Sequence, residues 1–553
     1  MRRSTAFGLT GILLLALALR LFPLTQSLYW GADFGEYHAI TQGLLADGRI
    51  SLDYRGWGTA YPYFPGMHIV QAAAVFAGVP PLLAEAALIP ALSSLAVLVV
   101  FLIAATITRH DGVGLIAAAF LAVAMPHVYA TAHAIPGAIG DLMFGACLLL
   151  ILRLRTDRRA LAPLLLITAA LIVTHHLSTY FLLVTAIFAF LLRIVVNARS
   201  PGAWREGIYL AILVPASFAY WIFYALPFQR QIFPQIQVPW PLLLAPFVFV
   251  VPLLLGIRKL RPRWRWTYVP KYPPRARTVR LLAATIAFIF AFLGLLFVVG
   301  VPGTSIRLPT NSLIVLAPLL VLFAMSASGR RFADFYPGGI DLSGWFVVIA
   351  LSAALGTAVA TTVLIPYRHT QYILWPVAVF VGLAFLGLFG GARRSGRVLL
   401  VAALLLVAAI PAAYPGRIVF VGHEERIPAE ALNSPRWLAD HGWGLVGSDH
   451  MGSMESFGFG GIDAVWDYTT EVVLAEDFAS AREAFANASF PAGHAPIRFV
   501  VLNNDIRAGA MLYPWDPAPP MSPAAAGKFE QPPFQRVFDD GYSTVYYLNW
   551  GLA

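Results

Sequence analysis

The stretch WGADFGEYHAI, residues 30–40, follows the first apolar run of the chain and places three ionisable residues within six positions. These residues are Asp33, Glu36 and His38. A carboxylate beside a membrane surface is energetically unfavourable, so such residues are commonly retained for chemistry. The surrounding sequence indicates which chemistry this is.

The composition of the chain is that of a polytopic α-helical membrane protein. It has 553 residues, of which 59% are hydrophobic and 12% charged, and its mean hydropathy is +0.72. The single cysteine, Cys147, lies in an apolar run and excludes an intramolecular disulfide. The formal net charge of +10 is concentrated in short segments, whose positions predict the topology.

Apolar segments long enough to cross a bilayer recur along the first three quarters of the chain. A crossing helix needs about 17–25 apolar residues. About thirteen spans are predicted, at 6–24, 84–108, 112–128, 138–153, 160–175, 177–196, 207–226, 240–257, 280–300, 312–328, 344–364, 371–390 and 397–413. The first follows a basic start like that of a signal peptide, but Arg20 interrupts it. We therefore expect an uncleaved span, with Arg20 reaching the outer interface.

Basic loops predict which ends of these spans face the cytoplasm. With a cytoplasmic N-terminus, the basic segments 153–159, 258–280 and 390–397 all fall inside, as expected for cytoplasmic loops. The middle segment has nine Lys and Arg and no acid. A membrane anchor explains it better than nucleic acid, so no nucleic-acid partner is expected. An odd number of spans places the C-terminus outside the cell.

The segment 63–79, YFPGMHIVQAAAVFAGV, is apolar, but counting it as a span breaks the charge parity downstream. We therefore expect an amphipathic helix lying along the outer surface. The first outer loop then extends over residues 25–83.

After residue 413 the composition changes. Residues 414–553 contain 17 acidic and 8 basic residues, and short strand patterns alternate with helical ones. IRFVVLNN and STVYYLNW are typical strands, while SPRWLADHG predicts a helix with Ser434 as N-cap and Pro435 at its first position. Two domains follow: a transmembrane domain, residues 1–413, and an extracytoplasmic soluble α/β domain, residues 414–553.

Most acidic residues outside the tail have an ordinary explanation. Six lie on the predicted outer side of the membrane part: Asp33, Glu36, Asp47, Asp53, Glu85 and Asp141. A turn accounts for Asp47, a polar loop for Asp53, and a helix start for Glu85. Asp33, Glu36 and Asp141 remain as catalytic candidates.

Basic and aromatic residues on the same side predict a phosphate site. Arg230, Arg307 and Arg368 lie in three different outer loops, and a guanidinium binds phosphate through two parallel hydrogen bonds. Alternatively, each is an interfacial anchor. Four further residues are candidates for contacting a lipid phosphate: Tyr37, His38, His175 and His176. The two neighbouring histidines fit metal ligation, substrate binding or a structural turn.

Order and spacing of these segments resemble the GT-C superfamily of membrane glycosyltransferases. GADFGEYHAI resembles the acidic motif of their first outer loop, and YPYFPGMHIVQAAAVFAGV resembles the surface helix of protein O-mannosyltransferases and aminoarabinose transferases. ATAHAIPGAIGDLMF matches their later outer aspartate through Asp141. YRHTQYILWPVAVFVG and, in part, AVWDYTTE (464–471) resemble oligosaccharyltransferase catalytic subunits, although Val465 and Thr469 depart from the acceptor motif.

The resemblance implies inverting transfer of a sugar from a polyprenyl-phosphate carrier to a glycan, lipid or protein acceptor at the outer membrane face. Asp33 would be the general base, and Arg368, with Arg230 or Arg307, would bind the leaving phosphate. A divalent ion, Mg, Mn or Zn, is an expected cofactor, with Asp33, Asp141 and His176 as its ligands. Asp33 and Asp141 are expected to face each other across one outer cavity.

Three other functions stay open from the sequence. An oligosaccharyltransferase-like enzyme would take a lipid-diphosphate donor and a protein acceptor. A transporter or flippase of a charged lipid or solute would also use membrane carboxylates and arginines, although such groups usually lie at mid-bilayer in paired, interrupted helices. A scaffold presenting the tail would leave the Asp33, Glu36 and His38 cluster unexplained.

Overall fold

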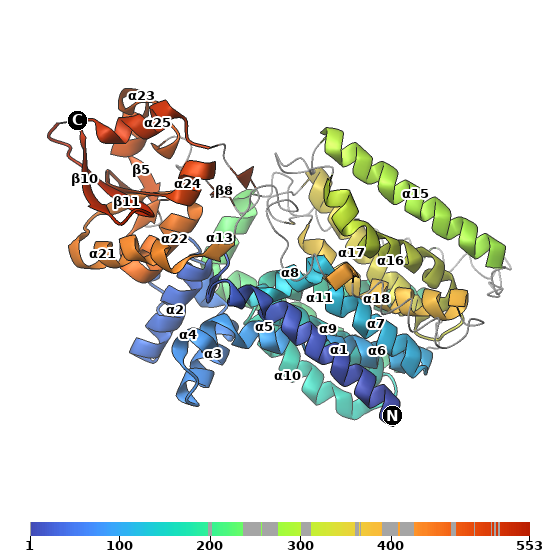
Figure 1. Cartoon of the computed structure of the whole chain (residues 1–553). Coiled ribbons are helices and arrows are strands. Elements are labelled where there is room, and N and C mark those ends of the chain that lie inside the picture. Colours follow the sequence, from blue (N-terminus) through green and yellow to red (C-terminus); the bar gives the residue numbers. More distant parts are fainter. Residues whose placement is uncertain are drawn as a thin grey trace.

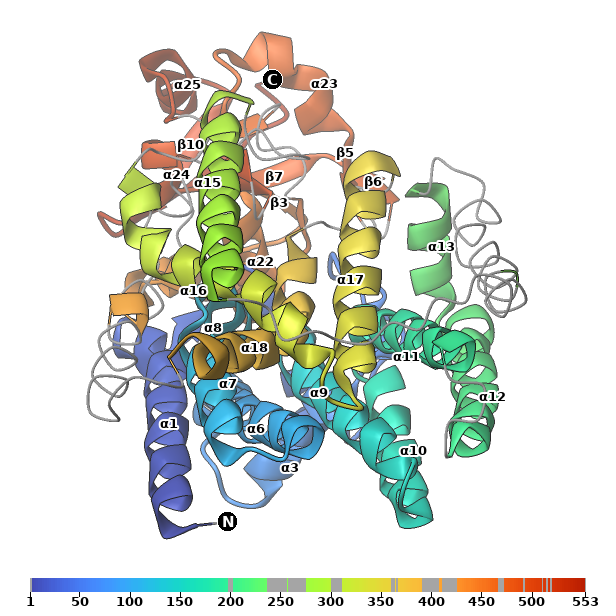
Figure 2. The same ribbon diagram turned by 90° about the vertical axis from the view of Figure 1, so that its right-hand side faces the viewer.

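The computed structural model of the chain describes most of its residues. They are 2–196, 202–235, 275–299, 311–359, 367–389, 425–465, 472–490, 493–509, 511–513, 516–517 and 520–552, with 256, 364 and 407–409 besides. A helical bundle makes up one part, and a mixed sheet with its own helices makes up the other (Figure 1). The N-terminus and the C-terminus lie at opposite ends of the molecule (Figure 2).

Among the described residues, seven helices are long and apolar enough to cross a membrane. They are Arg3–Thr25 (α1, Arg3–Leu21, and η1, Phe22–Thr25), Pro81–Thr108 (α4, Pro81–Ala86, α5, Leu88–Ser93, and α6, Ala96–Thr108), Pro136–Leu154 (α9), His176–Ile194 (in α11, His176–Val196), Ala203–Tyr224 (α12, Ala203–Ala219, and η4, Tyr220–Tyr224), Gly339–Thr357 (in α17, Gly339–Val359) and Arg368–Phe389 (α18). The chain is therefore a multi-pass membrane protein. Six of these helices match a predicted span to within about four residues at each end, whereas Gly339–Thr357 begins five residues before the predicted span 344–364 and ends seven residues before that span ends.

The predicted span 112–128 is not one straight helix. It is divided into α7 (Asp111–Val123) and α8 (Met125–Ala132), which meet at an angle of 61°. Ala124 between them has an extended backbone. The cause lies in the sequence, because Pro126 has no N–H and its ring clashes with a preceding turn. Continuing one helix through this position would therefore be unfavourable.

The other predicted spans are represented less completely. The helix at 160–175 is α10 (Leu161–Ile172), with 12 residues, which is shorter than the roughly 20 of a typical crossing. Predicted spans 280–300 and 312–328 fall in α15 (Arg275–Val299) and α16 (Asn311–Ala333). Most of 240–257 and 397–413 lies outside the described residues. The predicted total of about thirteen spans thus stays a prediction.

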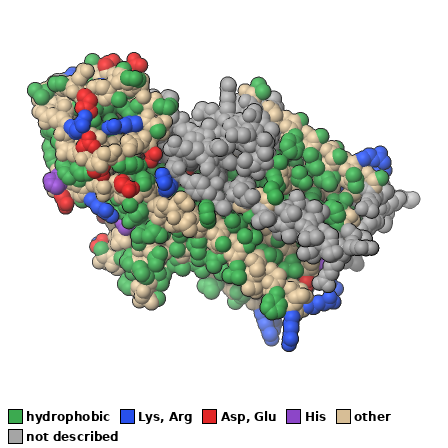
Figure 3. All heavy atoms as spheres, viewed as in Figure 1, with side chains coloured by type: hydrophobic (Ala, Val, Ile, Leu, Met, Phe, Trp, Pro, Cys, Tyr) green, Lys and Arg blue, Asp and Glu red, His purple; other side chains and the backbone are tan. Residues whose placement is uncertain are grey.

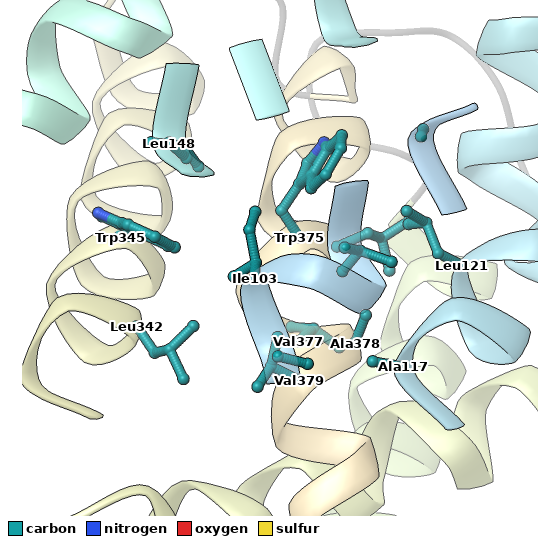
Figure 4. Packing of buried hydrophobic residues seen from close by; sticks show 14 of the residues in the cluster. Ile103, Ala117, Leu121, Leu148, Leu342, Trp345, Trp375, Val377, Ala378 and Val379 are labelled. Carbon is teal, nitrogen blue, oxygen red and sulfur yellow. The ribbon is translucent and has the colours of Figure 1, made fainter. Parts of the chain in front are cut away.

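The bundle packs around α18, whose membrane-spanning window is 78% buried. Trp375, Val377, Ala378 and Val379 of this helix lie among apolar side chains of α6, α7, α9 and α17 (Figure 4). Small residues allow the close approach, because a Cβ on Gly145 of α9 would lie 2.0 Å from the Trp375 ring. Burial of this apolar surface holds α18, and with it Arg368 at its start, in one position.

Residues 25–83 form the first predicted outer loop and contain short helices. They are α2 (Phe34–Asp47), η2 (Tyr61–Tyr63) and α3 (Gly66–Phe76), followed by α4 (Pro81–Ala86). The 11 residues of α3 extend about 16 Å at 1.5 Å per residue, which is too short to cross the roughly 30 Å hydrocarbon core. Ile69 and Phe76 expose their side chains, as an interfacial helix would.

The residues from 425 onward build a five-stranded mixed sheet in the order β10-β11-β7-β3-β4. β7 (Ile497–Asn503) pairs in parallel with β3 (Leu445–Gly447) and antiparallel with β11 (Ser543–Leu548). The outer strands are β10 (Phe534–Asp539) and β4 (Ala464–Val465). The remaining elements are β2 (Arg426–Ile427), η5 (Ala429–Leu432), α21 (Asn433–His441), α22 (His450–Gly460), α23 (Phe478–Ala486), β5 (Ala488–Phe490), β6 (Gly493–Ala495), α24 (Asn504–Gly509), β8 (Met511–Tyr513), β9 (Asp516–Pro517), α25 (Pro523–Gly527) and η7 (Lys528–Glu530).

The sequence patterns predicted the strands β7 and β11 correctly, but not the first residue of the helix α21. IRFVVLNN and STVYYLNW contain β7 and β11, as predicted. Ser434, however, is not the N-cap of α21, because the chain already turns as the 3₁₀-helix η5 up to Leu432. Its hydroxyl is buried and makes no hydrogen bond among the described residues. The prediction of this cap was wrong.

The sheet region is joined to the predicted first outer loop, residues 25–83, which we call the first outer segment. β1 (Tyr29–Trp30) pairs antiparallel with β2, so Tyr29 lies opposite Ile427 and Trp30 opposite Arg426. Next to this pairing, α22 lies against α2 (Figure 1). Acidic and basic side chains gather on the sheet region, whereas much of the described surface of the helices is apolar (Figure 3). Residues nearly 400 positions apart therefore meet beside Asp33.

Candidate functional site

Asp33 lies immediately before α2, at the N-terminus of the helix. Its Oδ1 atom is 2.8 Å from Nε2 of His450, the first residue of α22. The Asp33 side chain is 21% exposed, while that of His450 is fully buried. Asp33 is thus a carboxylate held on one side by the C-terminal region and accessible to solvent in part.

Glu36 lies one turn further along α2 and is fully buried. Its Oε1 atom accepts hydrogen bonds from the Tyr54 hydroxyl at 3.0 Å and from the Gly58 backbone N–H at 2.5 Å. Its Oε2 atom has no hydrogen-bond partner among the described residues. Burial, together with the nearby charge of Asp33, raises the pKa of Glu36 to about 8. At neutral pH, Glu36 is therefore mostly protonated.

Tyr37 and Tyr61 interact electrostatically both with the acidic residues of the motif and with Arg368. Their ring centroids are 5.2 Å apart. Burial and the charges of Asp33 and Glu36 raise the pKa of Tyr61 overall, although the charge of Arg368 acts in the opposite direction. Arg368 also interacts electrostatically with Tyr37, and its Nε donates to the Tyr367 hydroxyl at 2.9 Å. The structure thus brings Arg368 near the acidic motif.

His175 and His176 have different surroundings although they are neighbours. His175 Nδ1 is 2.7 Å from the Ser178 hydroxyl, which is in turn 2.6 Å from the Tyr372 hydroxyl of α18. The His176 ring packs against the rings of Phe64 and Phe228, at centroid distances of 5.3 and 4.6 Å. Both histidines lie close enough to Arg368 to interact with its charge.

His38, in contrast, is held by residues other than the two acids of its motif. Its Nδ1 is 2.6 Å from Oε2 of Glu85, and Gln42 donates to the other Glu85 oxygen at 2.7 Å. The His38 ring stacks on Phe459 of α22 at 4.4 Å. Glu85, which the sequence assigns to a helix start, therefore serves as the partner of His38.

Asp141 is enclosed within the helix bundle and is fully buried. Its Oδ2 is 2.8 Å from His127 Nε2, and its Oδ1 accepts from Trp375 Nε1 at 2.9 Å. The other ring nitrogen of His127 is 2.8 Å from Arg20. Both carboxylate oxygens of Asp141 thus have partners inside the protein, and the expected pairing with Asp33 across a cavity is not among the described contacts.

Arg20 also departs from its expected place at the outer interface. It is fully buried, and its Nε donates to Thr131 at 2.9 Å while a terminal nitrogen donates to the Ala16 carbonyl at 3.1 Å. Of the other predicted phosphate ligands, Arg230 is exposed on α13 (Leu226–Gln235). Arg307 lies outside the described residues, as does most of the segment 464–471.

Glu425, another residue of this region, was not predicted from the sequence. It accepts from the Ala32 N–H at 2.7 Å and from the Tyr129 hydroxyl at 2.5 Å, and its carbonyl accepts from the Gly31 N–H at 2.9 Å. Burial alone lowers the pKa of His133, but the neighbouring Glu425 carboxylate raises it overall. A single glutamate or histidine in a tail of mixed charge gives no pattern that connects it with a loop 400 residues earlier.

The predicted metal ligands do not form one coordination site. Asp33 bonds His450, Asp141 has both oxygens engaged by His127 and Trp375, and the His176 ring packs between aromatic rings. Among the residues that the structure describes, no group of three or more His, Cys, Asp or Glu side chains is arranged to hold a metal ion. The predicted ligands therefore do not fit the expected ion.

No family profile matches the sequence, and no curated protein matches it significantly. Solved structures do match. The oligosaccharyltransferase of Archaeoglobus fulgidus, with a tethered acceptor peptide containing the NVT sequon, is 14% identical at a TM-score of 0.57, and the match covers 92% of this chain and 70% of that one. The same enzyme with an inhibitory peptide and dolichol-phosphate matches at 0.55 with 13% identity, over 91% and 69%.

The aminoarabinose transferase ArnT of Cupriavidus metallidurans matches over 99% of both chains, with 15% identity and a TM-score of 0.40. At 14% sequence identity, the similarity to the archaeal enzyme establishes a shared fold and nothing about activity. The chain has a GT-C fold. This confirms the fold expected from the acidic loop motif and the order of the spans.

Proposed function

We propose that the chain is a membrane glycosyltransferase that transfers a sugar from a polyprenyl-phosphate carrier to an acceptor on the outer face of the membrane. The observation that supports this most directly is the gathering of charges around Tyr37 and Tyr61. The carboxyl groups of Asp33 and Glu36 and the guanidinium of Arg368 all act on Tyr61. A general base and a phosphate-binding cation within one region meet the needs of glycosyl transfer.

In the proposed reaction, an acceptor hydroxyl attacks the anomeric carbon of the donor sugar. Asp33 takes the proton of this hydroxyl as the new C–O bond forms. The bond between the anomeric carbon and the phosphate oxygen breaks, and its electron pair leaves with the polyprenyl phosphate. Arg368 stabilises the added negative charge on that phosphate. The reaction inverts the anomeric centre, because attack and departure occur on opposite faces.

Glu36 has a different part in this proposal. A carboxyl group with a pKa of about 8 is mostly neutral at neutral pH, so Glu36 is a poor candidate for the general base. Its bonds to Tyr54 and to the Gly58 N–H instead fix residues 54–58 beside Asp33. We therefore assign Glu36 to the architecture of the site, together with Tyr37. His175, His176 and Arg230 remain candidates for contacting the lipid phosphate.

The proposal includes a membrane orientation and two domains. Residues 1–413 would be the catalytic membrane domain, with about thirteen spans and a cytoplasmic N-terminus, and residues 414–553 the outer domain. The location of the two chain ends at opposite ends of the molecule supports this (Figure 2). So does the contact of the sheet region with residues 29–36, the segment that contains the proposed base.

A second candidate is oligosaccharyltransferase-like transfer from a lipid-diphosphate donor to a protein acceptor. The fold shared with the archaeal enzyme favours it. Its acceptor-motif counterpart, residues 464–471, lies mostly outside the described residues. The two candidate functions can therefore be distinguished by experiment, through the donor used (monophosphate or diphosphate) and the acceptor used.

Incubation of the purified full chain with radiolabelled polyprenyl-monophosphate and polyprenyl-diphosphate sugars tests the proposal. Each donor is paired with glycan, lipid and peptide acceptors, with and without a chelator. Transfer from a monophosphate donor supports the first candidate, and transfer from a diphosphate donor to peptide supports the second. Failure with every donor, together with solute flux in liposomes, would refute both and favour a transporter.

A further inference from the structure

Residues 30–36, which contain the proposed base, are held by the C-terminal region at three points. Before Asp33, the backbone N–H groups of Gly31 and Ala32 donate to Glu425, at 2.9 and 2.7 Å. At Asp33 itself, the carboxylate bonds His450 at 2.8 Å. After it, Gly35 lies against the backbone of α22. The local backbone is therefore fixed by residues that are 390 or more positions away.

His450 is itself held firmly in place. The carboxylate of Asp449 caps α22 by accepting from the Gly452 N–H at 2.8 Å, which sets the start of the helix where His450 lies. The Trp57 and His450 rings meet edge to face at 5.8 Å. The histidine is fully buried. An imidazole with so little freedom can hold the atom it bonds in one place.

The charges around His450 favour its protonated form. Burial alone lowers the pKa of His450, but its bond to Asp33 and the charges of Asp33, Asp449 and, when it is ionised, Glu36 raise it overall. Asp33 and Glu36 face it from the first outer segment, and Asp449 from its own helix. A protonated imidazole donates a charge-assisted hydrogen bond to a carboxylate, which is stronger and better directed than a neutral one.

We propose that His450 is a positioning residue for Asp33, holding Oδ1 so that Oδ2 is directed at the acceptor hydroxyl. This rests on the proposed function, in which Asp33 is the base. The C-terminal region then completes the catalytic site and is more than a cover over it. Orientation of a base by a fixed partner contributes to rate because the reacting atoms must meet within narrow limits.

Two substitutions separate the position of His450 from its charge. In His450→Gln, the amide nitrogen can replace Nε2 as a neutral donor, whereas His450→Ala removes the donor entirely. We expect kcat to fall about tenfold in the first and about a hundredfold in the second, from the usual strength of hydrogen bonds to charged groups. KM for the donor lipid should change little. His494→Gln, at an exposed position on β6, is the matched control with unchanged rates.

The dependence of the transfer rate on pH distinguishes a positioning role of His450 from a purely structural one. The pKa of His450 is raised, so its imidazolium is present at lower pH and is lost as the pH rises through that pKa. We expect an alkaline limb in the rate profile of the native protein, above the ordinary histidine range, and its absence in His450→Gln. Equal losses of kcat in Gln and Ala variants, with the limb retained in both, would overturn the proposal.

A measurement without turnover keeps this test separate from the proposed function. The pKa of His450 is measured by histidine-selective NMR of the full chain in detergent, with the signal assigned from His450→Gln. In Asp33→Asn we expect that pKa to fall, because burial then acts against less compensating charge. An unchanged titration would refute the coupling of the two residues. Absence of any glycosyl transfer with a changed titration would refute only the function.

Discussion

Gly35 of α2 and Gly458 of α22 form a close backbone contact between the first outer segment and the C-terminal region. A Cβ on Gly458 would lie 2.1 Å from the Gly35 carbonyl oxygen, and a Cβ on Gly35 would lie 2.2 Å from the Met454 carbonyl oxygen. Such distances are far inside van der Waals contact. The two helices approach so closely because both positions lack a side chain.

Gly35→Ala and Gly458→Ala should each force α2 and α22 apart. Overpacking of this kind destabilises by about 1–3 kcal/mol, and here it would also move Asp33 relative to His450. We expect a lower melting temperature and a greater loss of transfer activity than of expression. Gly43→Ala on the same helix has open space at its Cβ and is the control. Unchanged stability and activity in both variants would contradict the close crossing.

The raised pKa of Glu36 predicts a pH-dependent stability. Because its folded pKa, about 8, exceeds the ordinary value of 4.5, the unfolded chain loses the proton first as the pH rises. Stability should therefore fall between about pH 4.5 and 8, by up to roughly 5 kcal/mol. Glu36→Gln removes this dependence. Thermal unfolding in detergent at pH 5 to 9 measures it, with exposed Glu430→Gln as control, and parallel curves for Glu36→Gln and native protein would disprove it.

Asp141 and Arg20 belong to one buried network joined through His127. Removing one charge leaves the other buried without compensation, which destabilises by about 3–5 kcal/mol. We expect Asp141→Asn to reduce the yield and the melting temperature of the detergent-solubilised protein. Combining it with Arg20→Met should destabilise less than the sum of the single changes. Additive effects would show that the two residues are energetically independent, contrary to the network.

Arg368 is expected to bind the donor phosphate. Arg368→Gln should raise KM for the donor lipid about tenfold or more, since a hydrogen bond to a charged group is lost. Arg368→Lys should restore little of it, because lysine lacks the paired donors of a guanidinium. Arg230→Gln, at an exposed position, tests the alternative cation. A larger effect of Arg230→Gln than of Arg368→Gln would reverse the assignment of the two residues.

Much of the fold was predictable because hydrophobic length and strand alternation are local properties. Seven predicted spans, the short helix after residue 63 and the strands β7 and β11 follow from them. The break at Ala124 was missed although Pro126 signals it, because the overall hydropathy of residues 112–128 is that of one span. Local pattern decides whether a segment is apolar, and packing decides whether it stays straight.

The candidate site was predictable only in part. Asp33, Glu36 and Arg368 stand out as charges beside apolar runs, and the structure brings them to the same tyrosines. His450 and Glu425 lack such a signal, because their significance arises from pairing across nearly the whole chain. Asp141 misleads for a related reason: a carboxylate near a span end looks accessible, yet its partners His127 and Trp375 enclose it.

In the proposed reaction, sugar transfer depends on the Asp33 carboxylate. The most direct measurement is the initial rate of transfer from a radiolabelled polyprenyl-phosphate sugar by Asp33→Asn and by native protein, at equal amounts of folded protein. We expect a loss of at least about a hundredfold, the usual contribution of a general base, beyond any loss of folded protein that follows from removing the charge beside His450. Transfer at the native rate by Asp33→Asn would rule out Asp33 as the general base.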